Sequence, residues 1–341
     1  MNAGTGEDST DYFYNFPANR VELWFYLESA RFLHPVYREF YKERNVVREE
    51  RRMRVESDPQ GKLMEQMLAT AIAAHPYRVM PGGWASDIEN LRVRDAEKFF
   101  KEYYVPGNIT MAVVGDVNPA RIKALAEEYF ARLPKGPLPD PELTVEPPQE
   151  GPKRTEVASP AQPTEFIAYH RPSQYDKDDV VFDVISDLLA SGRTSIIYKD
   201  LVRDKKLALA AGAESGFPGT KYPTLFFFYL IPGLGHTAAE NEKELDTLIG
   251  NLQKTKVDEA SLARVKTRTR ATLIRQLDDN ASLAQLLASY YANFGDWKKL
   301  FTELDEMDKV TADDVQRVAK KYFTPENRTV ALTYQPEGGQ Q

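Results

Sequence analysis

The chain has 341 residues, of which 42% are hydrophobic and 11% aromatic, so it can bury the cores of two ordinary domains. Its net charge of −7 is modest and its basic residues form no block with interleaved aromatics, so we expect no nucleic-acid partner. No apolar run reaches the ~18 residues that span a bilayer, so we expect no membrane insertion. Zero cysteines exclude disulfides and thiolate sites. The composition is typical of a soluble protein and leaves the bacterial periplasm and the cytoplasm both open.

The first elements in chain order are a strand and turn within residues 1–15 and a helix over residues 35–57. In a helix, residues seven apart return to nearly the same angle, because two turns take ~7.2 residues. We expect the apolar stripe of this helix to face the core and the opposite face, with Arg48, Arg51 and Arg52, to lie in water. The stripe consists of Val36, Phe40, Glu43, Val46, Val47, Glu50 and Met53.

Glu43 and Glu50 are unexpected on an apolar stripe. An unpaired carboxylate in the core is costly or has a raised pKa, so both acids need partners. In one interpretation they pair with Arg or Lys of a neighbouring helix, since structural ion pairs of this kind are common. In the other, one glutamate binds a metal ion and the second supports the site. The helical pattern leaves both interpretations open.

The next recognisable elements form a repeat. Residues 101–113, KEYYVPGNITMAV, match residues 320–332, KKYFTPENRTVAL, at an offset of 320 − 101 = 219, and residues 64–70 match residues 283–289 at the same offset. Two matches at one offset indicate an internal duplication. In each longer copy a helix ends in an aromatic pair, Pro and Asn make the turn, and a β-branched strand is expected to follow.

The repeat suggests an α+β fold of two homologous modules, the first truncated at its N-terminus. Seven prolines in residues 133–154 indicate an extended linker. We therefore expect a first module over 1–132, the linker over 133–154, a second module over 155–336 and a disordered tail over 337–341. A first copy built like the second would begin near 150 − 219 = −69, so roughly 70 residues would be missing from it.

Strands and helices alternate irregularly in the second module. Strands are expected near 154–157, 165–169, 208–215, 224–230 and 328–334, and helices near 178–190, 194–203, 238–252, 259–277, 282–293, 297–308 and 312–322.

Four stretches carry a resemblance to a known family. They are residues 2–61, which begin NAGTGEDSTDYFYN, AHPYRVMPGGWASDIENL at 74–91, YYVPGNITMAVVGDV at 103–117, and SGRTSIIYKDLVRDKKLALAA at 191–211. They are similar to the insulinase, pitrilysin and mitochondrial processing peptidase family, zinc metallopeptidases with His-x-x-Glu-His on one helix and a glutamate ligand on a later one. The resemblance implies tandem α+β modules of the kind shared with LuxS and the processing peptidases.

The resemblance assigns roles to both unexpected glutamates. Glu50 aligns with the third zinc ligand, and Glu43 aligns with the acid that supports the zinc site. Zinc is the cofactor expected for the family, and we expect it to bind weakly or not at all to this chain alone.

The resemblance also implies a peptide-binding surface. Asn2 and Ala3 match an edge strand that lies alongside the peptide substrate, where main-chain pairing would bind extended peptides with little sequence demand. Arg203 aligns with the arginine of an Arg/Tyr substrate-binding pair, while Ala210 replaces the tyrosine.

The chain departs from the family in one major respect, because His-x-x-Glu-His is absent from its sequence. A catalytic zinc site needs about three protein ligands and an open position, and the resemblance supplies only one. Each of the four histidines stands alone: His34 and His75 are expected to cap or pack at helix ends, and His170 and His236 to be solvated.

Two functions remain open from the sequence. The first is a zinc metalloendopeptidase acting on extended oligopeptides, here without its His-x-x-Glu-His helix and so inactive alone. The second is a non-catalytic partner or scaffold subunit of a peptidase-like complex. The expected partners are a peptide substrate and either a second copy of the chain or a second peptidase-family subunit, because an uncovered sheet edge and apolar surface attract partners.

Overall fold

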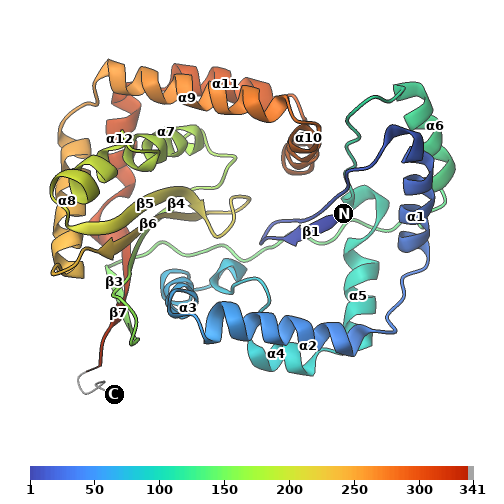
Figure 1. The fold of residues 1–341 in the computed structure, drawn as a ribbon, viewed down its shortest axis with the longest axis horizontal. Coiled ribbons are helices and arrows are strands. Elements are labelled where there is room, and N and C mark those ends of the chain that lie inside the picture. The colour runs from blue at the N-terminus through green and yellow to red at the C-terminus, as the bar shows by residue number, and fades with distance from the viewer. Residues whose placement is uncertain (337–341) are drawn as a thin grey trace.

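A five-stranded sheet organises the second half of the chain (Figure 1). The computed structural model describes residues 1–336, and the predicted tail, 337–341, lies outside them. The strand order is β3-β7-β4-β6-β5, with β3 parallel to β7 and all other neighbours antiparallel. The strands are β3 (Lys153–Ala158), β4 (Glu165–Arg171), β5 (Ala208–Phe217), β6 (Thr224–Pro232) and β7 (Arg328–Tyr334).

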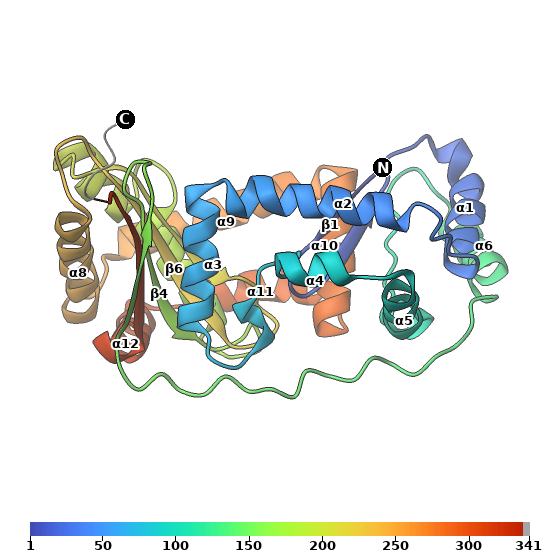
Figure 2. The same ribbon diagram turned by 90° about the horizontal axis from the view of Figure 1, so that it is seen from below.

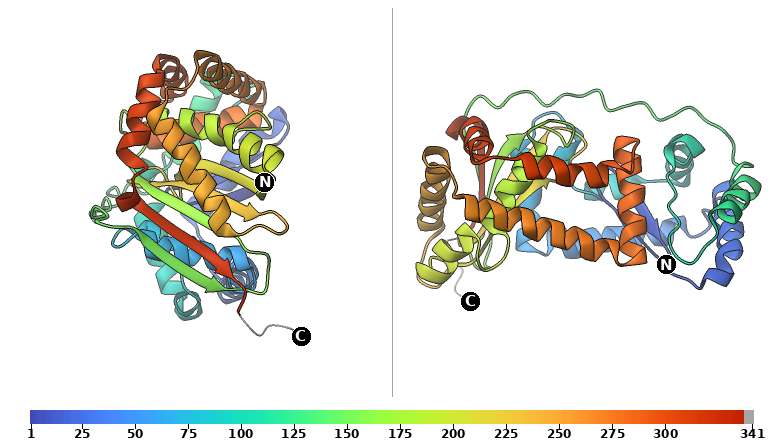
Figure 3. Two further views of the ribbon diagram at one scale, coloured as in Figure 1. Left: turned by 90° about the vertical axis from the view of Figure 1, so that its left-hand side faces the viewer. Right: turned by 90° about the horizontal axis from the view of Figure 1, so that it is seen from above.

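Six α-helices accompany this sheet in the second half of the described chain. They are α7 (Asp179–Ala190), α8 (Ala238–Lys254), α9 (Glu259–Leu277), α10 (Asn280–Phe294), α11 (Lys299–Lys309) and α12 (Ala312–Tyr322). Capping boxes begin α8 at Thr237 and α12 at Thr311, and Gly295 in the left-handed conformation ends α10. Figure 3 shows α9 and α11 side by side, with α10 across their ends. The predicted α+β class is confirmed.

Helices cover both faces of the sheet, which explains why its central strands are apolar on both sides. Successive side chains of a strand point to opposite faces. Phe226 and Phe228 of β6 accordingly pack with α7, α8, α9 and α12, whereas Leu225 and Phe227 pack with α3 (Pro59–Ala71). A helix from the first module's predicted range thus belongs to the core around the second module's sheet (Figure 2).

The first part of the chain has a two-stranded hairpin and several helices around a small core. Val21, Phe25 and Leu125 are its buried members. None of the helices within residues 1–336 is long and apolar enough to cross a bilayer. The elements besides α3 are β1 (Asn2–Thr5), β2 (Thr10–Phe13), α1 (Val21–Leu33), α2 (Phe40–Arg51), a π-helical turn (Arg52–Glu56), α4 (Ala85–Asn90), α5 (Val93–Tyr103) and α6 (Pro119–Phe130).

The strand predicted after Asn108 is wrong. Residues 109–114 belong to no strand, whereas their repeat counterpart forms β7 between β3 and β4. The sequence ITMAVV has a high preference for strand, but a strand also requires a neighbour to pair with. Within residues 1–336 this segment has none.

The predicted linker is extended and carries no helix or strand from residue 134 to residue 152. It runs along one side of the molecule, as Figure 2 shows. Glu146 attaches it to the end of α3 by accepting hydrogen bonds from the N–H groups of Ala73, Ala74 and His75 at 2.7–2.9 Å. Burial raises the pKa of Glu146, but these three donors outweigh burial and leave the pKa below its usual value.

Candidate peptide-binding edge and the two glutamates

The hairpin carries the residues predicted to bind peptide. Asn2 and Ala3 lie on β1, whose register pairs Asn2 with Phe13 and Gly4 with Asp11 of β2. In the sheet formed by these two strands, β1 has a neighbour on one side only, within the part of the chain that the structure describes. The predicted edge strand is present.

Alternation along the hairpin determines which main-chain groups face outward. Gly6 donates its N–H to the Ser9 carbonyl at 3.0 Å, so hydrogen-bonded pairs recur at every second residue from there. Gly4 therefore faces β2, while the N–H and C=O groups of Ala3 and Thr5 point to the outer edge. The Ala3 N–H donates to the Asn2 side chain at 2.9 Å, a contact that an incoming strand would have to displace.

One aspartate anchors this hairpin to the second half of the chain. Asp8 lies in the β1–β2 turn and accepts hydrogen bonds from the Tyr77 hydroxyl and from the N–H groups of Thr220 (2.8 Å) and Lys221 (3.2 Å). Burial, with the nearby Asp8 carboxylate, raises the pKa of Tyr77. The sequence analysis missed Asp8, because its partners lie far away along the chain and no local pattern marks them.

Glu43 and Glu50 lie on α2, as the helical pattern requires, but their stripe faces outward. Val36, Val46 and Met53 are 76%, 52% and 57% exposed. Glu43 is exposed, and the Glu50 side chain is 42% exposed and pairs with Arg54 at 2.7 Å. The prediction that this stripe faces the core is wrong for residues 1–336.

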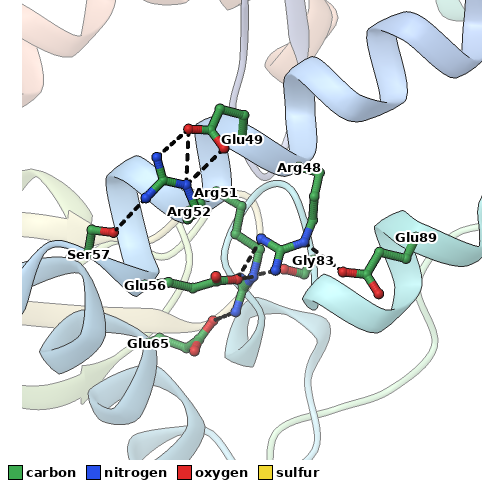
Figure 4. A network of polar contacts seen from close by, with 9 residues as sticks. All are labelled: Arg48, Glu49, Arg51, Arg52, Glu56, Ser57, Glu65, Gly83 and Glu89. Atoms are coloured by element: carbon green, nitrogen blue, oxygen red, sulfur yellow. Dashed lines mark hydrogen bonds and ion pairs between the residues drawn. The ribbon is translucent and has the colours of Figure 1, made fainter.

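Arg51, which belongs to the face of α2 expected to lie in water, is the buried residue of this helix, and ion pairs compensate its charge (Figure 4). Arg51 was expected in water, yet its side chain is 7% exposed; it donates to Glu65 and to the Gly83 carbonyl, each at 2.6 Å. Arg48 pairs with Glu56 at 2.9 Å and with Glu89 at 2.8 Å. A guanidinium can be buried when a carboxylate and a carbonyl accept hydrogen bonds from it in this way.

Arg203 lies apart from the hairpin, in a π-helical turn (Tyr198–Asp204) before β5. Its guanidinium is exposed and donates to Asp204 at 2.6 and 2.8 Å. Ala210, which stands where the family has tyrosine, lies on β5. Arg203 is thus accessible, but Asp204 already neutralises its charge.

His75 and His170 make structural contacts, and among residues 1–336 no histidine belongs to a group of three side chains that could hold a metal ion. His75 is buried and accepts the Tyr77 N–H at 3.2 Å at the start of a short helix, which confirms its predicted capping role. His170 was expected to be solvated but is half-buried, with Nε2 3.1 Å from the Ala71 carbonyl. This prediction was wrong because α3 packs over the end of β4.

Comparison with known proteins agrees with this fold. A family model described as "Peptidase M16 inactive domain" matches residues 90–269. The zinc protease PqqE of Helicobacter pylori is 31% identical over 344 residues, which cover 97% of this chain and 75% of that protein. The chain belongs to the M16 peptidase family. The predicted resemblance to the insulinase, pitrilysin and processing peptidase family is therefore confirmed.

Other M16 relatives extend the comparison. The crystal structure of a protease from Helicobacter pylori has a TM-score of 0.90 at 29% identity and covers 98% of this chain and 81% of that one. An uncharacterized zinc protease of Mycobacterium bovis is 23% identical over 82% of this chain. The chain spans 63% of that relative's length.

The names of these M16 relatives imply zinc in the family, but the residues described here do not make a zinc centre. Among residues 1–336, no three His, Asp or Glu side chains lie close enough together to hold a metal ion. Glu50, the predicted ligand, has an ion pair with Arg54 at 2.7 Å. A single carboxylate does not satisfy the three-ligand requirement of catalytic zinc.

Proposed function

We propose that this M16 chain binds extended peptides along the outer edge of β1 and does not cleave them by itself. The observation that carries the proposal is the geometry of the hairpin, in which Ala3 and Thr5 direct their main-chain groups outward. An extended peptide pairing there would gain main-chain hydrogen bonds at every second residue, with little dependence on its sequence.

The anchoring of the hairpin supports this role. Asp8 fixes the β1–β2 turn to Thr220 and Lys221, so the edge is held in place before a peptide arrives. A strand held in place binds more tightly than a flexible one, because less conformational entropy is lost. Arg203 would give a second contact for the peptide, as the family resemblance implies.

Glu50 and Glu43 would contribute to metal binding only in a site completed by further ligands. The Glu50–Arg54 pair is exposed and four residues apart, a type of contact worth about 0.3–0.5 kcal/mol. Such a contact breaks easily, so Glu50 could serve as a zinc ligand, with Glu43 as the supporting acid, where the remaining ligands are present. The hydrolysis of oligopeptides would belong to that completed site.

Peptides N-methylated at alternate residues test the edge-pairing proposal. A strand paired on one edge uses the N–H groups of every second residue, so methyl groups in one register block pairing and methyl groups in the other register do not. Fluorescence anisotropy should show that the two registers differ in affinity by about tenfold or more, since each lost hydrogen bond costs ~0.5–1.5 kcal/mol. Equal affinities in the two registers would contradict the proposal.

The second candidate is a scaffold or partner subunit that binds another peptidase-family subunit and no peptide. It is favoured by the lack of a three-ligand metal group within residues 1–336. Metal analysis and a quenched-peptide assay, with and without chelator, separate this chain from an active zinc peptidase: we expect little bound zinc and no chelator-sensitive cleavage. A chain that binds neither register of peptide but forms a stable complex with an M16 subunit would be a scaffold.

A further inference from the structure

A cluster of ionisable side chains lies where α7 meets α10 and α11. Asp179 and Asp183 are four residues apart on α7, so they share one face of that helix. The start of α11 brings Glu303 to the same place, where its charge interacts with those of both aspartates, and α11 contacts α7. Three carboxyl groups from two helices therefore meet at one interface.

The sheet holds the two acids of α7. Arg171, the last residue of β4, pairs with Asp179, and its side chain is only 1% exposed. The Ser215 hydroxyl of β5 donates a hydrogen bond to Asp183. Arg171 also donates to the Ser215 carbonyl at 2.5 Å. The strands β4 and β5 and the helix α7 are thus joined by one polar network.

The acid of α11 is held by α10 instead. The Tyr290 hydroxyl of α10 donates to Glu303 at 2.9 Å. Lys299 lies four residues before Glu303 and pairs with Glu306 at 2.5 Å, and its positive charge also acts on Asp179. The contacts of Glu303 therefore join α10 to the interface between α7 and α11.

The cluster contains more acids than cations. Its three half-buried acids already outnumber its two cations, and Asp176 and Glu306 add negative charge at its edges. Like charges that share a half-buried site cannot all ionise without cost, whereas one bound proton balances the three acids against the two cations. The three acids are Asp179, Asp183 and Glu303, and the two cations are Arg171 and Lys299.

Asp183 is the acid that keeps this proton near neutral pH. Burial raises its pKa to about 7, and the carboxylates of Asp179 and Glu303 add to the rise. The Ser215 hydrogen bond and the Arg171 charge oppose it. Burial also raises the pKa of Asp179 and of Glu303, so none of the three acids ionises as readily as it would in water.

The helix α10 connects the cluster to the hairpin, since it also contacts β2 (Figure 1). Beside the cluster, the Tyr175 hydroxyl donates to the Asn293 carbonyl at 2.8 Å and the Tyr175 ring packs edge-on against Phe294. The other end of α11 is fixed, because Met307 is buried in the core of the second half. Movement of α10 would therefore pivot the start of α11 and leave its end in place.

We propose that this cluster is a proton-dependent latch. It holds α10 and the start of α11 against α7 while one of the three acids is protonated, and it releases them when all three are ionised. Because α10 contacts β2, release would withdraw a support of the hairpin that binds peptide. This last step rests on the proposed function, whereas the latch itself does not.

The direction of the pH dependence follows from the raised pKa of Asp183. Water would solvate this carboxyl group in the released state, where its pKa returns to the ordinary value of ~3.9. The closed state keeps the proton up to about pH 7. The ratio of released to closed molecules should therefore rise about tenfold per pH unit between roughly pH 4 and pH 7 and then level off.

Spin labels on two introduced cysteines measure this ratio, because the chain has no cysteine of its own. Suitable sites are Gln285 on α10 and Arg193 after α7, both of which are exposed. Pulsed EPR should show a second distance between the labels that gains population from pH 5 to pH 7. A single distance from pH 5 to pH 8, or a second distance that gains population toward acidic pH, would overturn the proposal.

Three substitutions locate the proton. Asp183→Asn and Glu303→Gln each remove one carboxylate, so Arg171 and Lys299 balance the remaining two and the closed distance should persist to pH 8. Asp305→Asn changes an exposed acid of the same helix α11 and should keep the pH dependence of the unmodified chain. The same pH dependence in all three variants would contradict the latch.

Ser215→Ala distinguishes titration of Asp183 from a loss of packing. The Ser215 hydroxyl stabilises the ionised form of Asp183, so its removal should raise by about one unit the pH at which the ratio levels off. A substitution that only loosened the interface would change the ratio by the same factor at every pH. That result would show that Asp183 is not the titrating group.

Fluorescence anisotropy with an extended peptide tests the coupling to the hairpin separately. If the closed state binds the peptide, apparent affinity falls in proportion to the closed fraction. Affinity should therefore decrease as the pH rises for the unmodified chain and stay constant for Asp183→Asn. Equal pH dependence in the two proteins would overturn the coupling. Absence of peptide binding at every pH would contradict the proposed function, while the label distances would still decide the latch.

Discussion

Replacement of Arg51 tests whether its buried ion pairs fix α2, and with it Glu43 and Glu50. The Arg51 side chain is 7% exposed and donates at 2.6 Å to both Glu65, itself 15% exposed, and the Gly83 carbonyl. Arg51→Ala would leave a largely buried carboxylate and a carbonyl without their donor. Removing one partner of a buried pair costs about 3–5 kcal/mol, so we expect a loss of that size in the free energy of unfolding.

The adjacent Arg52 provides the control. It begins the π-helical turn that follows α2, is 54% exposed, and pairs with Glu49, which is 53% exposed. Exposed pairs contribute about 0–1 kcal/mol, so Arg52→Ala should be nearly neutral. Urea unfolding followed by circular dichroism, at one pH and protein concentration, gives both values. If the two variants lose the same free energy, the Arg51 contacts do not hold α2 and our account of its orientation is refuted.

Three further predictions concern the frame around the site. Gly219→Ala would place a Cβ 2.6 Å from the Asp8 carboxylate and should cost about 1–3 kcal/mol. Gly250→Ala on α8 adds a Cβ that meets open space, so it should instead stabilise the protein by up to about 1 kcal/mol. Urea unfolding measures both variants, and equal effects would contradict the close approach of Gly219 to Asp8. Leu63→Ala on α3 should lower the free energy of unfolding by about 2–5 kcal/mol and destabilise the sheet of the second half as well as α3. Amide exchange checks this, and faster exchange in α3 alone would show that α3 is not part of that core. Burial, with the nearby carboxylate of Glu242, raises the pKa of Glu165 to about 9. Between about pH 5 and pH 9 the folded protein therefore keeps a proton on Glu165 that the unfolded chain, with a glutamate pKa of ~4.3, has released. The free energy of unfolding should fall as the pH rises through this range, and Glu165→Gln should remove the Glu165 contribution to that slope.

The second half was predictable because its patterns are strong and its partners are present. The helix expected over 178–190 is α7, Asp179–Ala190, and the strand expected over 224–230 is β6, Thr224–Pro232. Both elements are apolar enough to be buried wherever they pack. Residues 109–114 were not predictable in the same way, because a β-branched segment becomes a strand only when another strand pairs with it.

The orientation of α2 shows the limit of a helical pattern. Periodicity identified a stripe, but the side of a helix that is buried depends on what packs against it. Arg51 is buried because Glu65 and Gly83 come from segments further along the chain, and no spacing within residues 35–57 reveals them. Glu43 and Glu50 could be named from the resemblance, whereas Asp8, which anchors the edge strand, required the three-dimensional structure.

The most direct test of the central claim is a crystal structure of the chain with a bound extended peptide. We expect the peptide to lie beside β1 as an added strand and to exchange main-chain hydrogen bonds with Ala3 and Thr5. The Asn2 side chain should then release the Ala3 N–H that it accepts at 2.9 Å in the free chain. A peptide bound elsewhere, with that Asn2–Ala3 contact intact, would contradict the account.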